Sequence, residues 1–509
     1  MSAITIPATA PAIEEAFAAS RSAYLVLEGQ ITSPQAAAMD HGTLEEHLAE
    51  CGREFLRVMF QSHLRLRAMQ EERIEQVADH EGIGRNRIER RSTRMLAGIF
   101  GGVEVARMAY RGDYVHNLHV LDAQLNLPAV KHSHGIKKMA AAAASRGSFH
   151  DAAEQIRQRT GSAIGKRQVE QLACDAARDI EDFYHDQVPE PATGQTVLVI
   201  SLDGKGIVIR PASLRPETAK AAAAKGANTY RTRLASGEKN GRKRMAEIGA
   251  LYDAEPVVRN VADILPTRVE RDLAERTEGP MAFNKYLTGS VQHPAAHVVA
   301  EVFDQATARD PKHQRTWIVL VDGAAHQLDL VHAEAKRRKV RIHVIVDFIH
   351  VLEYMWKAAW CLHESGDPGA EEWVAIHGRD LLAGRAGHVI DELGREARAA
   401  ALPAAKRKGI DDAISYLTAK KPYLRYDKAL ASGWPIATGI IEGACRHLVK
   451  DRMDITGARW GLTGAEAVLK LRALRSNGDF DTYWRYHLAR EHERNHLARF
   501  NSGLIPTNR

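Results

Sequence analysis

Two apolar runs of this chain end in the same way, and they constrain its fold more than any other feature. Residues 197–202 lead into Asp203-Gly204, and residues 317–321 lead into Asp322-Gly323. Runs of five or six β-branched or apolar residues predict strands that are buried on both faces. An aspartate just past such a strand is expected at the carboxyl edge of the sheet, where α/β folds place ligands. Carboxylates gathered at one edge are ligands for hard divalent cations.

A third run extends this pattern. Residues 340–346 predict another strand, and the segment Asp347-Phe348-Ile349-His350 follows it directly. Residues 356 to about 426 then show helical periodicity with many charges and no strand candidate. An apolar, glycine-containing stretch from 433 to 441 leads into Glu442, which we expect on a helix. The strand-rich part is therefore predicted to be interrupted by a helical block.

Composition narrows the class of protein. The 509 residues carry a formal net charge of +6, which permits a polyanionic partner without proving one. Four scattered cysteines with no Cys-x-x-Cys pair argue against a disulfide framework and a zinc ribbon, and they fit a reducing cytoplasm. The N-terminal residues lack the pattern of a secretory signal. No apolar stretch approaches 18 residues, so we expect no membrane span and a cytoplasmic location.

Basic side chains fall in three local clusters. The clusters comprise Arg85, Arg87, Arg90, Arg91 and Arg94; Lys239, Arg242, Lys243 and Arg244; and Lys336, Arg337, Arg338 and Lys339. A single cluster of this kind is explained equally well by a solvated helix face or loop as by a binding surface. Three of them in a chain with a predicted carboxylate site favour a phosphate backbone as partner.

The N-terminal third is predicted to be mainly helical and to serve in dimerisation or DNA binding. Residues 1–140 combine helical periodicity over 43–76 with a plausible β-hairpin over 96–110. Residues 141–190 contain two short helical patterns, 149–159 and 166–177, around Thr160-Gly161-Ser162. This pair resembles a helix-turn-helix, whose second helix would place Lys166, Arg167 and Gln168 in the major groove. An ordinary helical hairpin is the alternative.

The remaining chain is divided by these patterns into a first core part at 191–355, an all-helical insertion at 356–432, and a last core part with C-terminal helices at 433–509. The order is strand–Asp203, strand–Asp322, strand–Asp347-x-x-His350, insertion, then Glu442. This order resembles the DDE transposases of bacterial insertion sequences, with the Kra group of the Mutator-like set as the nearest match. The resemblance covers roughly residues 195–485 and implies a multidomain α/β protein with an RNase H-like core.

The segments that carry the resemblance are short, and only their order is specific. They are Ser201-Leu202-Asp203-Gly204-Lys205-Gly206, Val321-Asp322-Gly323-Ala324, residues 347–354 and the run from Gly439 to Trp460. The resemblance implies that Asp203, Asp322 and Glu442 are the catalytic triad and hold two Mg²⁺ ions, for which Mn²⁺ can substitute. Asp347 is the rival for the second place, and His350 is expected to support the site or to contact DNA near it.

Residues around the triad are candidates for DNA contacts. Arg446, Lys450 and Arg452 follow Glu442 on what we expect to be the same helix, where Arg446 and Lys450 share a face. Lys205 follows Asp203 and is a further candidate for a phosphate contact. Trp356 and Trp360, four residues apart, could stack on an extruded base, although tryptophans at this spacing usually pack in a core.

The resemblance implies a transposase that binds the terminal inverted repeats of its element, cleaves DNA strands and joins them to a target, as a homodimer or larger assembly on double-stranded DNA. A nuclease of the same fold that cuts without joining is the first alternative, because the triad would be shared. A DNA-binding derivative without catalysis is the second. A glycosidase with paired carboxylates is disfavoured by the basic clusters and by an aromatic content of 6%.

Overall fold

The chain is a mixed α/β protein that divides into two units. The computed structural model describes residues 9–187, 189, 195–224, 243–267, 270, 277–455 and 457–507. Contacts group Met1–His185 with Asp479–Arg509 in one unit and place Asp186–Gly478 in the other. The segment 433–509, which the sequence presents as one C-terminal part, is thus divided at Asp479. Within the described residues, no helix has both the length and the apolar character needed to cross a bilayer.

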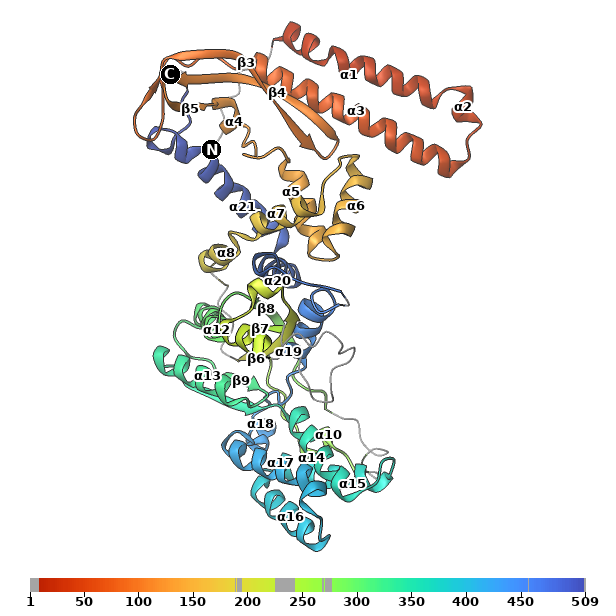
Figure 1. The fold of residues 1–509 in the computed structure, drawn as a ribbon, viewed down its shortest axis with the longest axis vertical. Helices are drawn as coiled ribbons and strands as arrows, with labels where there is room; N and C mark the ends of the chain where they lie inside the picture. The colour runs from red at the N-terminus through yellow and green to blue at the C-terminus, as the bar shows by residue number, and fades with distance from the viewer. Residues whose placement is uncertain are drawn as a thin grey trace. The chain divides into compact units, whose positions relative to one another are not determined.

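The N-terminal unit starts with a long helical hairpin and a small sheet. Figure 1 shows α1 and α3 running side by side, with α2 at their shared end. The bounds are α1 (Ala10–Ile31), α2 (Pro34–Ala37), α3 (His41–Met69), β1 (Val77–Ala78), β2 (Gly84–Arg85), β3 (Arg87–Gly98), β4 (Gly101–Gly112) and β5 (Val115–Leu118). The predicted hairpin is confirmed, because β3 and β4 pair antiparallel with a tight turn at Gly101, whose φ is +124°.

Shorter helices complete this unit. They are α4 (Val120–Gln124), α5 (His134–Ala144), α6 (Phe149–Thr160), α7 (Lys166–Ala177), α8 (Ile180–Asp186), α21 (Phe480–Asn495) and the 3₁₀ turns η4 (Leu497–Arg499) and η5 (Asn501–Gly503). The predicted pair of short helices is confirmed as α6 and α7. Gly161 ends α6 in the left-handed region, at φ 68°, and Ile156 of α6 and Leu172 of α7 are buried.

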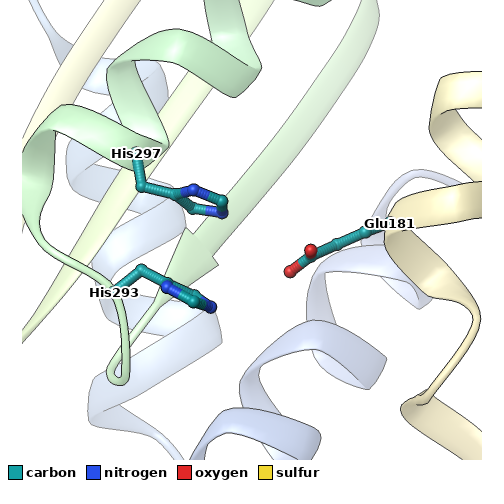
Figure 2. A group of neighbouring side chains, drawn as sticks. All are labelled: Glu181, His293 and His297. Carbon is teal, nitrogen blue, oxygen red and sulfur yellow. The ribbon is translucent and has the colours of Figure 1, made fainter.

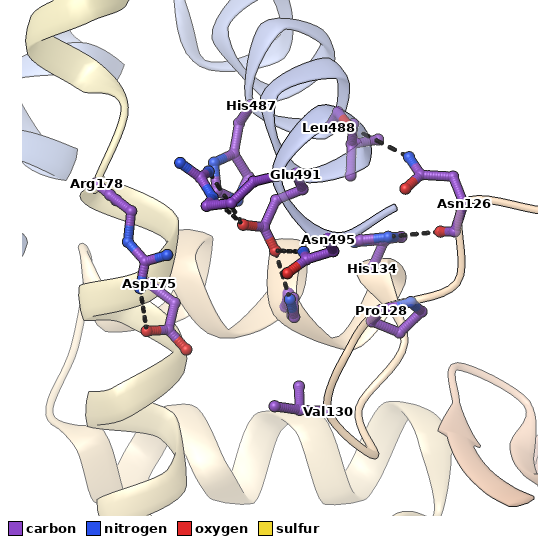
Figure 3. A network of polar contacts seen from close by, with 12 residues as sticks. Asn126, Pro128, Val130, His134, Asp175, Arg178, His487, Leu488, Glu491 and Asn495 are labelled. Carbon is purple, nitrogen blue, oxygen red and sulfur yellow. Dashed lines mark hydrogen bonds and ion pairs between the residues drawn. The ribbon is translucent and has the colours of Figure 1, made fainter. Parts of the chain in front are cut away.

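Buried ion pairs join the C-terminal helix α21 to the N-terminal residues of the same unit (Figure 3). Lys137 Nζ of α5 lies 3.1 Å from Glu491 Oε2. Asp179 accepts hydrogen bonds from His487, at 2.7 Å, and from Arg494, at 3.0 Å. Burial opposes the charge on Asp179, but these two partners outweigh it and lower its pKa to about 2. Charges held in this way explain why residues from Asp479 onward belong to this unit.

Acid is expected to destabilise the N-terminal unit through His134. Burial lowers the pKa of this imidazole from 6.5 to about 4, although Nε2 lies 2.9 Å from the Asn126 carbonyl oxygen (Figure 3). The folded state therefore binds fewer protons than the unfolded state between these values. The lowered pKa of His134 therefore contributes about 2–3 kcal/mol to the free energy of unfolding above pH 6.5. This contribution is lost as the pH falls to 4.

Hydrogen exchange of α5 amides between pH 7 and pH 4.5 measures this loss. His134→Gln should flatten the pH dependence, because the amide group does not titrate and can still donate to Asn126. The exposed His80 supplies the matched control, and His80→Gln should leave the profile unchanged. An unchanged slope in His134→Gln would show that other groups carry the acid sensitivity.

The second unit is built on a five-stranded mixed sheet of order β10-β9-β6-β7-β8. The strands are β6 (Val197–Val208), β7 (Lys243–Ala254), β8 (Ala282–Ser290), β9 (Trp317–Val321) and β10 (Ile342–Val346). β7 and β8 run antiparallel to their neighbours, whereas β9 and β10 are parallel to β6. Around the sheet lie η1 (Pro211–Ser213), α9 (Pro216–Ala224), α10 (Val261–Ile264), α12 (Ala295–Arg309) and α13 (Ala325–Arg338).

The prediction that the first strand ends before Asp203 is wrong. β6 continues through Asp203 to Val208, because its antiparallel pairing with β7 extends from Val197↔Ala254 to Val208↔Lys243. Its parallel pairing with β9 stops earlier, at Ser201↔Leu320. Asp203 therefore lies within a strand, just beyond the last residue that pairs with β9, while Asp322 does follow the end of β9.

The predicted helical block after the third strand is confirmed (Figure 1). It contains α14 (Phe348–Leu362), α15 (Pro368–Leu382), α16 (Ala386–Ala399), α17 (Ala404–Lys420), η2 (Lys421–Tyr423) and α18 (Tyr426–Ala431). Met355 and Leu417 of the block share one buried cluster with Val199 and Ile318 of the sheet. The chain then forms α19 (Gly439–Ala444), a π-helical segment η3 (Cys445–Lys450) and α20 (Leu462–Ser476).

Candidate metal centre

A small cavity of about 150 Å³ at the sheet edge collects five carboxylates. Its lining consists of Leu202, Asp203, Asp322, Asp347, His350, Glu353, Thr438, Ile441 and Glu442. The structure thus brings together the three predicted triad residues and both predicted supporting residues. Among the residues that the structure describes, no lysine or arginine lines this cavity. The negative charge of this cavity would therefore be balanced by a bound cation.

Asp203 is held by the central strand β6. Its Oδ1 accepts a hydrogen bond from the Gly204 amide at 2.6 Å. Burial raises the pKa of the neighbouring Cys445 thiol, and the charge and hydrogen bonding of Asp203 raise it further. Burial also raises the pKa of Glu247 on β7, with a smaller contribution from Asp203. Burial and the neighbouring carboxylate therefore both favour the protonated form of this thiol.

Asp322 and Asp347 lie at the ends of the adjacent parallel strands β9 and β10. Asp322 is half-buried, and its Oδ1 accepts from the Ala324 amide at 2.9 Å. Asp347 is only 2% exposed and uses both oxygens, Oδ1 for the Ile349 amide at 3.0 Å and Oδ2 for the Thr438 hydroxyl at 2.6 Å. Asp347 is therefore engaged in capping α14, which makes Asp322 the more accessible ligand.

Glu442 reaches the cavity from α19, where it is exposed. Thr438, one helical turn earlier, places its Oγ1 2.6 Å from Asp347 Oδ2 and 3.3 Å from Glu442 Oε1. This hydroxyl links the buried aspartate to the helix that carries Glu442. Sequence reasoning missed Thr438, and the four-residue spacing to Glu442 is the one signal that could have identified it.

The helical block also reaches the site. Tyr416 of α17 donates its hydroxyl to the Asp322 backbone oxygen at 2.6 Å and stacks on Tyr354 with ring centroids 4.0 Å apart. His350 Nδ1 lies 3.4 Å from Glu353 Oε2, and its ring packs edge-on against Tyr416. Sequence reasoning missed Tyr416 and Glu353. The contact shows that α17 helps to position the loop that carries Asp322.

A basic wall borders the carboxylates on one side. A second cavity of about 360 Å³ shares Asp203 and Glu442 with the first and is otherwise lined by Lys205, Cys445, Arg446 and Lys450. The three cations are exposed. We name Lys205, Arg446 and Lys450 the basic wall. These three predicted phosphate contacts therefore gather beside the predicted triad.

Two other predicted DNA contacts are placed differently. Arg452 lies beyond the end of η3, so its predicted position on the helix of Glu442 is wrong. It is 5% exposed and packs its guanidinium over the Trp460 ring at 4.7 Å. Trp356 is half-buried, stacks on Trp360 with centroids 5.4 Å apart, and packs against the core. The core interpretation of Trp356 fits this position better than base stacking.

The remaining candidates lie in the N-terminal unit at the start of α7. Lys166 and Arg167 are exposed there. Gln168 is half-buried, and its Oε1 accepts from the Gly165 amide at 3.1 Å, so its side chain caps α7. An exposed basic pair is compatible with a DNA contact, whereas Gln168 is occupied by the helix it starts.

Several members of the three basic clusters are used in ion pairs. Arg85 is 6% exposed and pairs with Asp79 at 2.8 Å. Arg338 lies 2.6 Å from Glu334. Lys239 and Arg242 lie outside the described residues. The clusters as a whole are therefore weaker evidence for DNA binding than the basic wall.

The ligand set fits magnesium or manganese. Asp203, Asp322 and Glu442 offer only carboxylate oxygens, which these hard cations prefer. Other groups in the described chain bring three ligand atoms within 4.8 Å of one another, and this trio is not among them. Three carboxylates of this kind can hold a pair of divalent ions.

Histidines of the same unit form a separate feature (Figure 2). The rings of His293 and His297 stack with centroids 4.2 Å apart, and His297 Nε2 lies 3.7 Å from Glu301 Oε1. Glu181, drawn in the same view, belongs to the other unit. Neither histidine lines the carboxylate cavity. Imidazole nitrogens also favour zinc-like metals over magnesium.

Comparison with known proteins gives no family: no family model matches the chain, and no curated protein is significantly similar to it.

Proposed function

We propose that this protein is a DDE transposase that binds the ends of its element, cleaves DNA strands there and transfers them to a target. One observation carries the proposal. Asp203, Asp322 and Glu442, which are far apart in the sequence, line one cavity without a lysine or arginine among its described lining residues, and the basic wall adjoins it. Carboxylates for metal ions beside cations for phosphates are the two components that phosphodiester chemistry needs.

The fold supports the proposal. Three antiparallel strands, β6 to β8, precede the parallel strands β9 and β10, and the helical block separates β10 from the helix of Glu442. This arrangement is compatible with an RNase H-like core that carries a helical insertion. The first carboxylate lies on the central strand and the last on a helix beyond the insertion, which is the order that the resemblance implies.

Each part of the site has a chemical task in this account. A bound pair of divalent ions would supply a deprotonated nucleophile and stabilise the leaving oxygen. Asp203 and Asp322 would hold the ions from rigid backbone, while Thr438 keeps Glu442 oriented toward them. Lys205, Arg446 and Lys450 would bind the flanking phosphates and so set the register of the DNA strand.

A metal-dependent nuclease that cuts without joining uses the same carboxylates, and a DNA-binding derivative would keep the basic wall without turnover. An assay with the purified protein separates the three. The substrates are duplexes carrying the DNA that flanks the coding region, uncut and pre-cleaved, with a target plasmid and Mg²⁺. We expect cutting at the element end and covalent joining to the plasmid. Cutting without joining would favour the nuclease, and neither product would favour the inactive derivative.

The basic wall predicts a measurable salt effect on DNA binding. Lys450→Gln should weaken binding to a duplex and reduce the slope of log affinity against log salt by about 1, because one phosphate contact is lost. Lys408→Gln removes the same charge from the exposed face of α17 and serves as the control. Equal slopes for the two variants would remove Lys450 from the DNA interface.

A further inference from the structure

Two neighbouring helices of the helical block each carry a histidine and a carboxylate about one turn apart. α15 has His377 and Asp380, and α16 has His388 and Glu392. Side chains three or four residues apart lie on the same face of a helix. Both pairs belong to the second unit, and neither contributes to the carboxylate cavity at the sheet edge.

Three of these side chains converge, and the fourth, His377, joins them through Glu392. Ligand atoms of Asp380, His388 and Glu392 all lie within 4.8 Å of one another. His388 Nε2 is 3.4 Å from Glu392 Oε1 and 3.8 Å from Asp380 Oδ2. His377 Nδ1 is 3.6 Å from Glu392 Oε2. Ligands bound tetrahedrally to zinc at its usual bond lengths lie about 3.3–3.5 Å apart. Asp380, His388 and Glu392 are close to this spacing, and a movement of His377 Nδ1 toward them would complete such a site.

His377 gives independent evidence for a ligand. The residue is 2% exposed, and its Nδ1 has no hydrogen-bond partner in the described structure although it faces Glu392. A buried polar atom without a partner is unfavourable and rare. A metal ion at this position would satisfy it.

The carboxylate of Glu396 orients the His377 ring for metal binding. Its other nitrogen, Nε2, lies 3.5 Å from Glu396 Oε1, and Trp373 Nε1 donates to Glu396 Oε2 at 2.8 Å. Histidines that bind metals typically place their second ring nitrogen against a carboxylate, which fixes the tautomer and the ring orientation. The chain Trp373–Glu396–His377 leaves Nδ1 directed at the cluster.

We propose that His377, Asp380, His388 and Glu392 bind a transition metal of the zinc class and so fasten α15 to α16. Two nitrogens and two carboxylate oxygens form a donor set that suits zinc and differs from the oxygen-only set of the catalytic cavity. Arg385 pairs with Asp380 Oδ1, and Arg395 lies 3.2 Å from Glu392 Oε1. Both arginines are exposed, and surface pairs of this kind contribute little, so a metal ion can displace them.

Zinc titration of the untagged full-length protein, in excess Mg²⁺, tests the site, with Co²⁺ absorption as a second readout of geometry. We expect the protein to bind one equivalent of Zn²⁺ and its Tm to rise when this ion is bound. His388→Gln, at a half-exposed position that folding should tolerate, is expected to weaken binding at least about 10-fold and to remove the Tm shift. Glu396→Gln should weaken binding by about 10-fold through the orientation of His377.

Two further variants complete the test. His363→Gln removes a histidine of the same block that pairs with Asp367 outside the cluster, and it should bind Zn²⁺ as the wild type does. Asp203→Asn should also bind one equivalent of Zn²⁺, whatever its effect on DNA cleavage. Absence of stoichiometric Zn²⁺ in the wild type, unchanged affinity in His388→Gln, or loss of the equivalent in Asp203→Asn would each overturn the proposal.

Discussion

Asp203→Asn is expected to abolish strand cleavage, with a fall of at least about 10³-fold in rate, while binding of the DNA end is retained. The side chain lines both the carboxylate cavity and the cavity of the basic wall. In the proposed mechanism its charge would bind the metal ions directly. Ions bound there stabilise the transition state by several kcal/mol, and each 1.36 kcal/mol corresponds to about a factor of ten in rate. Cleavage and gel-shift assays on the same duplex measure the two effects.

Asp329 provides a matched control for this substitution. It is an exposed aspartate of α13, and Asp329→Asn makes the same chemical change outside the site. Its cleavage rate should equal that of the wild type. If purified Asp203→Asn still cleaves the end at a comparable rate, Asp203 does not hold a catalytic metal.

Asp253→Ala is expected to destabilise the sheet-bearing unit by about 3–5 kcal/mol, because it leaves a buried guanidinium without its carboxylate. Arg315 Nη2 lies 2.6 Å from Asp253 Oδ1, with both side chains at most 2% exposed, and Asn284 donates to Asp253 Oδ2 at 3.1 Å. The pair joins β7 to the segment before β9, and β9 leads into Asp322. Native-state hydrogen exchange of the β9 amides reports the loss within this unit.

Two comparisons make that result specific. Asp304→Ala removes an exposed partner of Arg338 and should cost no more than about 1 kcal/mol. The double variant Asp253→Leu/Arg315→Met should recover much of the stability, since apolar residues of similar size can replace a buried ion pair. A loss in Asp253→Ala no larger than in Asp304→Ala would contradict the account of the pair.

Local patterns predicted that the aspartates at the strand ends meet, whereas only the resemblance to DDE transposases implied that Glu442 joins them. Apolar runs mark strands buried on both faces, and the carboxyl ends of neighbouring parallel strands share one edge, so Asp322 and Asp347 had to lie close together. The helical block and the position of Glu442 on a helix followed from periodicity and order. These predictions depend on short-range signals that the chain carries plainly.

Other features depend on long-range contacts and left no local signal. Asp203 lies inside β6 because β7 pairs with the whole strand. Residues 197–208 alone do not determine how far β7 pairs with them. Tyr416 reaches Asp322 only because α17 folds back onto the sheet. Arg452 was predicted on the helix of Glu442, yet that helix ends at Lys450 and the guanidinium packs over Trp460.

The division at Asp479 has the same origin. Asp179 binds His487 and Arg494 across more than 300 residues of sequence, and such pairs cannot be assigned from composition or periodicity. The sequence accordingly predicted the helices and strands of both units, but it did not predict that the last helix belongs to the N-terminal unit.

Iron-directed backbone cleavage tests the central claim most directly. Fe²⁺ can replace Mg²⁺ at a carboxylate site, and with ascorbate and peroxide it generates radicals that cut the chain close to the bound ion. We expect cuts near Asp203, Asp322 and Glu442 in the wild type, and these cuts should be suppressed by excess Mg²⁺ and lost in Asp203→Asn. Cuts that avoid these three segments, or that persist unchanged in Asp203→Asn, would contradict a divalent metal centre at this edge of the sheet.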